Sequence, residues 1–343
     1  MRIIIVLSAA LMFAIGADAQ TEYTVTNVVT NAKDARLVNP WGLSHPAVNS
    51  HKNNEWWVAD QGTGYSTLYS ANGSIADLAV SIPAAGGAGT GSPTGIASNS
   101  PVVEVFAFAT LDGTISTWSA YSTPTNPGKN CYECHVSTAN IEVNNWASGA
   151  SYQGLTIATN AGTGALAYYV ANANGGIEVY DASTFAPVTL ASGAFTDPRI
   201  PASYTPAGIQ AIGSKIFVTF NASAGGGTGY VDAFDTNGKL LLRLENGWFN
   251  QPWGVASAPG NFGSFSSMIL VGNTGSGWIG AYNSKTGAFK GFLQSGGADL
   301  FIPGLWALGF GDGSSQSGPT DVLYFNAGGA SQTTGVFGAI SAE

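Results

Sequence analysis

A short phrase that ends in a small residue and an aliphatic one recurs six times between residues 39 and 310. Its small residue lies at positions 42, 95, 154, 208, 254 and 307, so successive copies are 53, 59, 54, 46 and 53 residues apart. A self-similar period near fifty residues is typical of repeat folds. The copies read Asn39-Pro40-Trp41-Gly42-Leu43, Ser92-Pro93-Thr94-Gly95-Ile96, Tyr152-Gln153-Gly154-Leu155, Thr205-Pro206-Ala207-Gly208-Ile209, Gln251-Pro252-Trp253-Gly254-Val255 and Leu305-Trp306-Ala307-Leu308.

Each phrase is followed by two further strand-like segments and, in most repeats, by a weaker fourth one. The second is an apolar run that ends in a polar residue, as in residues 56–60, and the third alternates apolar with small or polar residues. Six such repeats predict an all-β chain that folds as a six-bladed β-propeller with four-stranded blades. The last repeat supplies only three strands, so we expect residues 23–29 to close that blade as its outer strand. The blades are expected to start near residues 39, 92, 152, 205, 251 and 303.

The start of the chain has the pattern of a secretory signal peptide. Arg2 precedes an apolar stretch, and Ala17-Asp18-Ala19 forms a cleavage site of small residues. The apolar stretch is too short to span a membrane. We therefore expect residues 1–19 to be a signal peptide and residues 20–343 to form a single propeller domain. The mature protein is expected to be secreted, or periplasmic if its source is a Gram-negative bacterium.

Charged residues make up only 9% of the chain, and its formal net charge is −9. Nucleic acids and anionic membranes both favour Lys and Arg, so neither is an expected partner. We expect a monomer whose partner is a small molecule or a carbohydrate. Asn72-Gly73-Ser74 and Asn221-Ala222-Ser223 are glycosylation sequons, which matter only if the source is a eukaryote.

Several of these segments resemble an uncharacterised secreted propeller family of bacteria and fungi. The resemblance covers nearly all of residues 22–340 and implies an NHL-like six-bladed propeller. That family has no agreed activity, so the resemblance supplies no catalytic residues, and a fold alone does not determine function. Residues 121–146 depart from the family pattern: they lengthen the second repeat and contain both cysteines. The segments that carry the resemblance are 37–43, 57–69, 208–210, 252–265, 270–273 and 304–308.

Polar residues end the second segment at matching positions in five of the six repeats, namely Asp60, Thr110, Asn172, Asn273 and Asn326. Propeller topology should bring these ends to one mouth of the central channel, together with Asn39. Carboxylate and amide oxygens are the ligands that Ca²⁺ prefers, which makes Asp60 a candidate metal ligand. The alternative is that Asn and Asp stand at strand ends because they accept turn conformations. Further oxygens could come from the nearby loops that carry Asp112, Asn174 and Asp197.

Trp41, Trp253 and Trp306 share one position of the repeat, and Trp56 and Trp57 lie close to the first of them in the sequence. Two roles fit these rings. They could offer an aromatic platform for a sugar at the channel mouth, or they could fill the space between blades. Recurrence in register with the repeat favours packing.

The two cysteines of the chain lie in Cys131-Tyr132-Glu133-Cys134-His135, which matches the attachment motif of c-type haem. The polar surroundings argue against haem attachment and favour a local disulfide between Cys131 and Cys134 in an oxidising compartment. A redox dithiol is a third alternative. If haem were bound, His135 would be one axial ligand, and the second would come from His45, His51 or Met268.

Catalysis by histidine is poorly supported, because none of the three histidines stands at a repeated channel position. His45 is interpreted as a turn residue before Pro46. The leading hypothesis is a ligand-binding module. Its first alternative is a Ca²⁺-dependent lactonase or hydrolase with Asp60 or Asp112 as base, and its second is an exported c-type haem protein. The predicted ligand site at the channel mouth comprises Asn39, Trp41, Asp60, Asn172, Trp253, Asn273 and Asn326.

Overall fold

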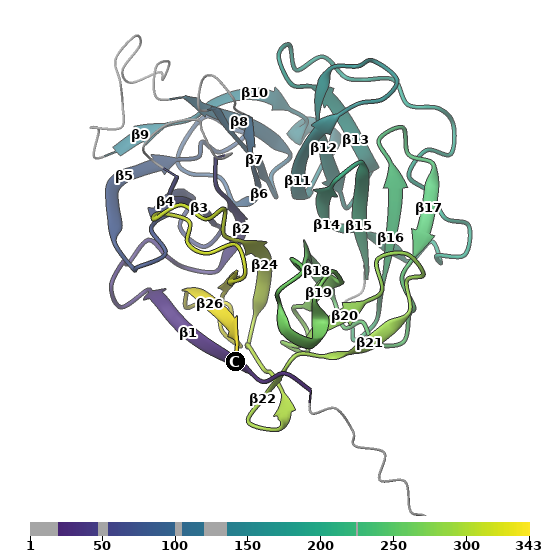
Figure 1. Cartoon of the computed structure of the whole chain (residues 1–343). Coiled ribbons are helices and arrows are strands. Elements are labelled where there is room, and N and C mark those ends of the chain that lie inside the picture. The colour runs from purple at the N-terminus through teal and green to yellow at the C-terminus, as the bar shows by residue number, and fades with distance from the viewer. Residues whose placement is uncertain (1–19, 47–53, 100–104, 120–135, 224–225) are drawn as a thin grey trace, which may run out of the picture.

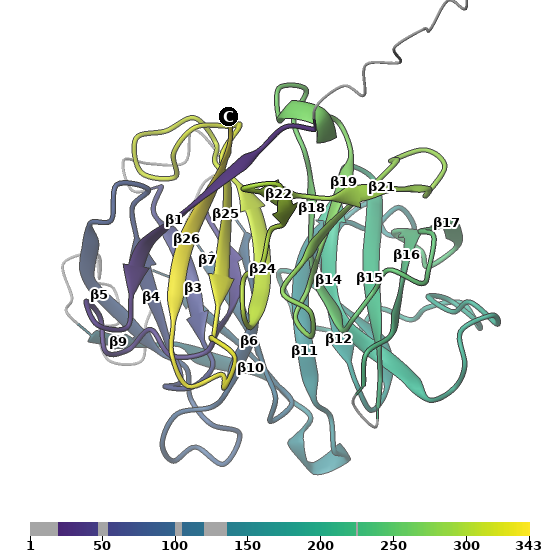
Figure 2. The same ribbon diagram turned by 90° about the horizontal axis from the view of Figure 1, so that it is seen from below.

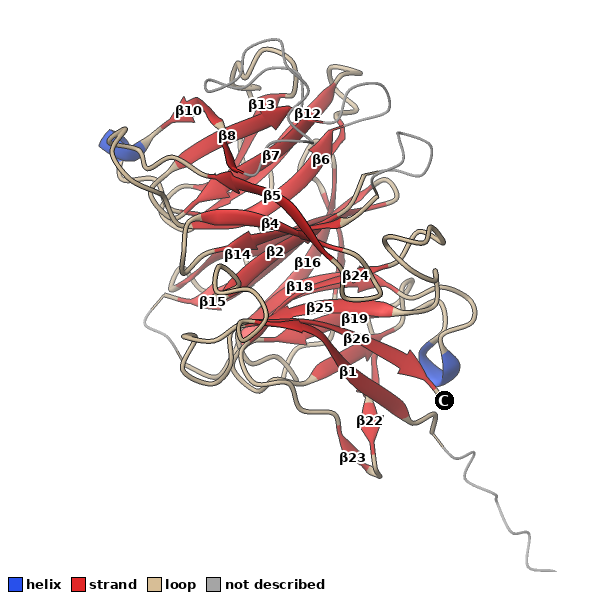
Figure 3. Cartoon of the chain, turned by 90° about the vertical axis from the view of Figure 1, so that its left-hand side faces the viewer, coloured by secondary structure: helices blue, strands red, loops and turns tan. Residues whose placement is uncertain are grey.

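The computed structural model of the chain is a ring of six small β-sheets around a central channel (Figure 1). It describes residues 20–46, 54–99, 105–119, 136–223 and 226–343. Within those ranges the helical elements are two short 3₁₀ turns, Trp146–Ser148 and Gly263–Phe265, and strands make up the rest of the regular structure (Figure 3). The predicted six-bladed β-propeller is therefore confirmed.

Each blade is an antiparallel sheet, and one copy of the recurring phrase opens its innermost strand. The inner strands are β2 (Pro40–Ser44), β6 (Pro93–Asn99), β11 (Tyr152–Thr159), β14 (Tyr204–Ile212), β18 (Pro252–Ser257) and β24 (Leu305–Phe310). The second strands are β3 (Trp56–Asp60), β7 (Val105–Thr110), β12 (Leu166–Asn172), β15 (Lys215–Ala222), β19 (Ile269–Asn273) and β25 (Leu323–Ala327). The third strands are β4 (Tyr65–Tyr69), β8 (Thr114–Ser119), β13 (Gly176–Asp181), β16 (Gly229–Asp235), β20 (Ile279–Tyr282) and β26 (Val336–Ala342).

The outer strands differ more than the inner ones. Blades one, two, four and five end in β5 (Ile75–Ser81), β10 (Asn140–Asn144), β17 (Leu240–Arg243) and β21 (Phe289–Phe292). The third sheet has three strands, and a β-bridge between Tyr180 and Pro187 extends it. The first sheet gains a fifth strand, β9 (Val136–Thr138), which pairs parallel to β5. A short hairpin of β22 (Gln294–Ser295) and β23 (Ala298–Asp299) follows β21.

The last blade is closed by the start of the described chain, as predicted. Strand β1 (Tyr23–Thr30) pairs antiparallel with β26, so that Tyr23 lies opposite Ala342 and Thr30 opposite Val336 (Figure 2). This pairing gives the sixth sheet the order β1-β26-β25-β24. The ring is therefore closed by the antiparallel pairing of β1 with β26, which is interrupted by one register shift between Asn27 and Val29.

The small residue of each phrase lies where neighbouring inner strands come closest. The pairing of every inner strand shifts register within its phrase, as between Pro40 and Leu43, which marks a β-bulge. A Cβ atom on Gly42 would lie 2.5 Å from the carbonyl oxygen of Thr94 in the next blade. On Gly208 it would overlap the carbonyl of Trp253. The repeated glycine is therefore the residue that lets these backbones converge on the channel axis.

Large side chains fill the wedges between blades. Trp56 and Trp57 are consecutive in β3, so they leave the sheet on opposite faces. The ring of Trp57 stacks on Phe106 of the second blade at a centroid distance of 3.9 Å. Trp56 packs on Tyr324 of the sixth blade at 5.1 Å. One strand thus contributes a tryptophan to each of its two inter-blade cores.

Some sequence predictions fall outside the described residues. These are the signal peptide of residues 1–19, the Cys131, Cys134 and His135 motif, and His51. For the described ranges, no helix has the length and apolar character that crossing a bilayer requires.

Candidate functional site

The two ends of the central channel differ. We call the end where the inner strands begin the tryptophan end, because Trp41, Trp253 and Trp306 meet there. Trp41 and Trp306 stack at a centroid distance of 3.8 Å, and Trp253 meets them edge-on at 6.2 and 5.9 Å. The three residues are only 8%, 9% and 7% exposed. These rings therefore pack against one another and fill this end of the channel.

Hydrogen bonds fix two of the three indoles. The Trp306 Nε1 group donates to Asn39 Oδ1 at 3.0 Å, and the Trp253 Nε1 group donates to the carbonyl oxygen of Gln153 at 3.1 Å. The buried Nε1 group of Trp41 has no partner within the described residues. Asn39, predicted as a ligand-binding residue, thus uses its amide oxygen to hold a tryptophan.

The predicted amides at the ends of the second strands are buried and bond to nearby backbone. Asn172 Oδ1 accepts from the backbone N–H groups of Ser151 and Asn174, both at 3.0 Å. Asn273 Oδ1 accepts from the backbone of Asn250 at 2.9 Å, and Asn326 Nδ2 donates to the carbonyl of Gly42 at 2.8 Å. Each amide ties the end of a second strand to the segment that begins an inner strand, in its own or a neighbouring blade.

Asp60, at the matching position of the first blade, is completely buried. Its Oδ2 atom accepts from the hydroxyl of Thr67 at 2.8 Å, while its Oδ1 atom has no partner in the described structure. Burial raises the pKa of this carboxyl well above its usual value, and the negative charge of Asp34 acts in the same direction, against the hydrogen bond from Thr67. Burial of Asp60 thus favours the protonated form of its carboxyl.

The calcium hypothesis depends on how many oxygens can converge on Asp60. Asn326 Oδ1 is a second buried oxygen without a partner in the described ranges. Ca²⁺ takes about six to eight oxygens, and the described residues include no group of three or more His, Cys, Asp or Glu placed to hold a metal ion. Calcium binding at Asp60 therefore stays a prediction.

Two acidic residues of the nearby loops, Asp112 and Asp197, also have hydrogen-bond or ion-pair partners within the protein. Asp112 Oδ2 accepts from the backbone N–H of Ala85 at 2.7 Å. Asp197 Oδ2 lies 2.6 Å from Arg199 and 2.8 Å from Arg243, so that carboxylate is paired with two guanidinium groups. These arginines, with burial opposing them, hold the pKa of Asp197 below its ordinary value, and the hydrogen bond from Arg199 is the largest cause.

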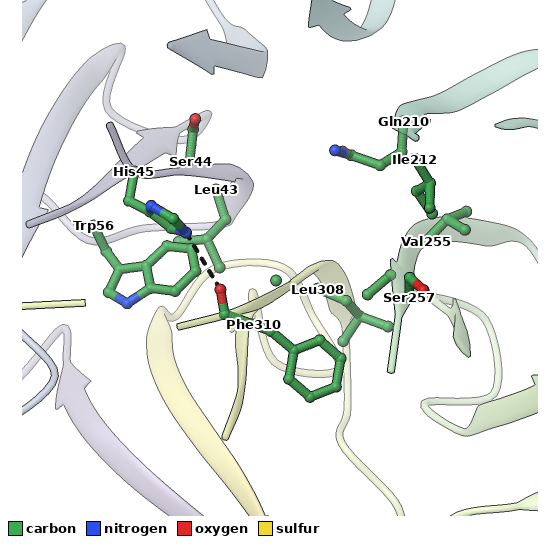
Figure 4. Close-up of a pocket in the computed structure, with 12 residues that line it drawn as sticks. Leu43, Ser44, His45, Trp56, Gln210, Ile212, Val255, Ser257, Leu308 and Phe310 are labelled. Carbon is green, nitrogen blue, oxygen red and sulfur yellow. Dashed lines mark hydrogen bonds between the residues drawn. The ribbon is translucent and has the colours of Figure 1, made fainter. Parts of the chain in front are cut away.

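The opposite end of the channel, where β2, β18 and β24 finish, contains a cavity of about 300 Å³ (Figure 4). We call it the His45 cavity. Four of the six blades line it, and its polar side chains are those of Ser44, His45, Gln210 and Ser257. Figure 4 shows Gln210 extending into the gap from the wall opposite Ser44 and His45. The remaining lining residues are Leu43, Trp56, Ile212, Val255, Ala256, Leu308, Gly309 and Phe310.

Between the two ends the channel narrows. A space of about 20 Å³ remains among the inner strands, lined by Gly42, Gly95, Leu155 and other phrase residues. That space admits about one water molecule. The His45 cavity is therefore a blind pocket whose floor is formed by the converging phrases.

His45 is held against the wall of this cavity by several contacts. Its ring meets Trp56 edge-on at a centroid distance of 4.5 Å. The Nδ1 atom lies 2.8 Å from the carbonyl oxygen of Pro46, and the Nε2 atom lies 3.3 Å from that of Phe310. Both ring nitrogens therefore face backbone carbonyl oxygens at the cavity wall.

A carboxylate stands behind this histidine. Asp312 Oδ2 lies 3.8 Å from His45 Nδ1 and accepts from Asn54 Nδ2 at 3.1 Å. Burial opposes ionisation of Asp312, but hydrogen bonds from Ser317 and Ser314, together with His45, keep the pKa of Asp312 below its ordinary value. Sequence reasoning interpreted His45 only as a turn residue before Pro46. The signal that could have revealed its place was its position directly after the first inner strand.

Comparison with known proteins gives relatives without an assigned activity. No family model matches the chain. An uncharacterized protein of Acanthamoeba polyphaga mimivirus is 28% identical over 306 residues, which cover 83% of this chain and 72% of the relative. A second uncharacterized protein of the same virus is 27% identical over 336 residues, covering 92% and 83%. These relatives are viral, so they do not support the bacterial and fungal source of the resembled family.

Solved structures confirm the fold. A gluconolactonase of Xanthomonas campestris has a TM-score of 0.55 at 11% identity, covering 97% of this chain and 94% of its own. A glucose dehydrogenase has a TM-score of 0.55 at 12% identity, covering 93% and 100%. The PQQ-bound aldose sugar dehydrogenase of Streptomyces coelicolor has a TM-score of 0.51 at 14% identity, covering 95% and 100%. At such identities the likeness shows a six-bladed β-propeller fold and no activity.

Proposed function

We propose that the protein is a ligand-binding module that takes a small molecule with both polar and apolar groups into the His45 cavity. The observation that carries this proposal is the contrast between the two channel ends. The tryptophan end is filled by packed rings, whereas the His45 end keeps a cavity of about 300 Å³ with polar side chains at its wall. Small-molecule sites are typically concave, and a few placed polar groups in them orient the ligand.

The lining defines the chemistry of the ligand. Leu43, Ile212, Val255, Leu308 and Phe310 offer apolar contact to a carbon skeleton. At the wall, the Ser44 hydroxyl and the Gln210 and Ser257 side chains can exchange hydrogen bonds with one polar group of the ligand, such as a hydroxyl or carbonyl. The volume lies at the lower end of the range of about 300 to 1,000 Å³ that is usual for ligand pockets, so a compact molecule fits best.

A fragment library screened by ligand-observed NMR tests the proposal. Ser257 is exposed at the rim, so Ser257→Trp should fill the entrance without disturbing the core. Ser257→Ala is the matched control, because it removes only the hydroxyl. We expect some compact fragments to bind the wild type and Ser257→Ala but not Ser257→Trp. If no fragment distinguishes the tryptophan variant from the alanine variant, the proposed site is wrong.

The other functional hypotheses stay predictions from the sequence. Ligand binding at the tryptophan end and a Ca²⁺-dependent lactonase or hydrolase there remain predictions. Three further properties also remain predictions: export, a monomeric state and membership of the resembled secreted family. The Cys131–Cys134 disulfide and the c-type haem alternative depend on residues outside the described ranges.

A further inference from the structure

We propose a second binding site, for a neutral sugar, in a depression around Trp146. The depression has a volume of about 430 Å³ and is open to solvent. It belongs to the face of the tryptophan end, because Ser92 and Ser151 immediately precede the inner strands β6 and β11. Leu111, a further lining residue, also packs against the buried tryptophan cluster. The rest of the lining is Asp112, Gly149, Ala150 and Asn174.

Trp146 is the aromatic side chain that this site offers. It is 63% exposed, in contrast to the 7% to 9% of the three packed channel tryptophans. The negative face of an indole attracts the weakly positive C–H bonds on one side of a pyranose ring, and the contact also removes apolar surface from water. The platform expected from the sequence at Trp41 and Trp253 is thus offered by a tryptophan outside the repeat.

The backbone that carries Trp146 is held firmly. The backbone N–H of Trp146 donates to Asn144 Oδ1 at 3.2 Å, and the N–H of Gly149 donates to the carbonyl of Trp146 at 2.9 Å. From the next blade, Asn174 Nδ2 donates to the carbonyl of Gly149 at 2.9 Å. The 3₁₀ turn of residues 146–148 is therefore fixed from both ends, which limits the ordering cost of binding.

A partly buried polar network supports the same turn. Asn145, which precedes the turn, donates from Nδ2 to the hydroxyls of Tyr152 and Tyr180, both at 2.8 Å. These hydroxyls donate to Glu178 Oε2 at 2.7 and 2.6 Å. Asn172 completes the network by donating to Glu178 Oε1 at 2.6 Å. Such a satisfied network specifies one geometry, as a preorganised site requires.

The polar lining of the depression suits sugar hydroxyls. Each Asp112 oxygen accepts one backbone N–H, from Ala85 and Ser92, and keeps further acceptor capacity. Asn174 Oδ1 is a second acceptor, because the hydrogen bond to the Gly149 carbonyl is made by Asn174 Nδ2. The only charge in this lining is that of a carboxylate, and the whole chain has a net charge of −9. Both charges favour a neutral sugar over an acidic one.

The test is titration of the whole chain with cellopentaose, laminaripentaose, xylopentaose, mannopentaose and chitopentaose, followed by calorimetry. We expect at least one of these probes to bind, and Trp146→Ala to weaken that binding about tenfold, the scale of one lost aromatic contact. Trp248→Ala is the control, because Trp248 is also exposed but lies on another part of the ring. It should leave the affinity unchanged.

The proposal is overturned if none of the five probes binds the wild type, or if Trp146→Ala binds as well as Trp248→Ala. Tetragalacturonate serves as an acidic comparison, and tighter binding of it than of every neutral probe would also contradict the proposal. Fragment binding in the His45 cavity should be the same in the wild type and Trp146→Ala. The two sites can therefore fail or succeed independently.

Discussion

The two ends of the central channel are built from the same six inner strands, yet one is filled and the other is hollow. At the tryptophan end the phrase recurs in register, and Trp41, Trp253 and Trp306 pack on one another. At the other end the strands finish in residues that differ between repeats, such as His45, Ser257 and Phe310, and a cavity remains. Repetition in this chain therefore marks ring closure, and the departures from it coincide with the places where we propose that ligands bind.

The largest loss of stability should come from removing a ring at the tryptophan end. Trp306→Ala removes a buried ring that stacks on Trp41 and bonds to Asn39, so we expect the free energy of unfolding to fall by about 3 to 5 kcal/mol. Trp146→Ala is the control on an exposed ring and should change it by no more than about 0.5 kcal/mol. Urea unfolding measures both. Similar losses in the two variants would show that the channel tryptophans do not hold the ring together.

A smaller loss of stability is expected from a substitution where the inner strands converge. A Cβ atom at position 208 would overlap the carbonyl of Trp253, so Gly208→Ala should destabilise the protein by about 1 to 3 kcal/mol. Gly86→Ala is the matched control, because no atom lies within 4 Å of its Cβ position. The comparison is again made by urea unfolding. An unchanged midpoint in Gly208→Ala would mean that the phrase glycine is not a packing requirement.

The buried carboxyl at the tryptophan end predicts a pH effect. The pKa of Asp60 in the folded protein is raised, so the stability that the protonated group gives is fully present below its unfolded pKa of about 3.9 and is lost as pH rises through the folded pKa. Asp60→Asn cannot ionise and can still accept from Thr67. The stability of this variant relative to the wild type should therefore increase between pH 4 and pH 8, as measured by urea unfolding. A constant difference in stability between the two proteins over that range would contradict a raised pKa of Asp60.

The same variant tests calcium. If a cation binds at Asp60, Ca²⁺ should raise the wild-type melting temperature by mass action and leave Asp60→Asn unaffected. A calcium-dependent rise that disappears in Asp60→Asn would support the metal hypothesis at this end of the channel. Equal wild-type melting temperatures with Ca²⁺ and with a chelator would contradict it.

The fold could be predicted from the sequence because the phrase and its neighbours repeat. The pairing of β1 with β26 followed from the missing strand of the last repeat. Other long-range pairings left no local pattern: β9 adds to the first blade in parallel, and the third sheet stops at three strands. These features depend on segments whose pairing partners lie far away in the chain, so strand periodicity does not reveal them.

The candidate sites were harder to predict because burial is invisible in the sequence. Asn172, Asn273 and Asn326 occupy matching positions, but whether an amide at a strand end bonds to backbone or to a ligand depends on the neighbouring blade. His45 and Trp146 stand outside the repeat, so no comparison between repeats singles them out. Only their three-dimensional surroundings, a cavity wall and an open depression, distinguish them.

We propose that the ligand binds at the His45 end of the channel. The indole N–H signals of the nine tryptophans can locate a bound ligand directly. Trp56 lines the His45 cavity and donates from Nε1 to the carbonyl of Ser317, whereas Trp41 and Trp306 lie at the filled end. These signals are assigned in ¹H–¹⁵N spectra by single Trp→Phe substitutions. On titration with a fragment that binds, we predict that the Trp56 signal shifts and that the Trp41 and Trp306 signals do not. Shifts of Trp41 and Trp306 with an unmoved Trp56 would place the ligand at the tryptophan end and contradict the account.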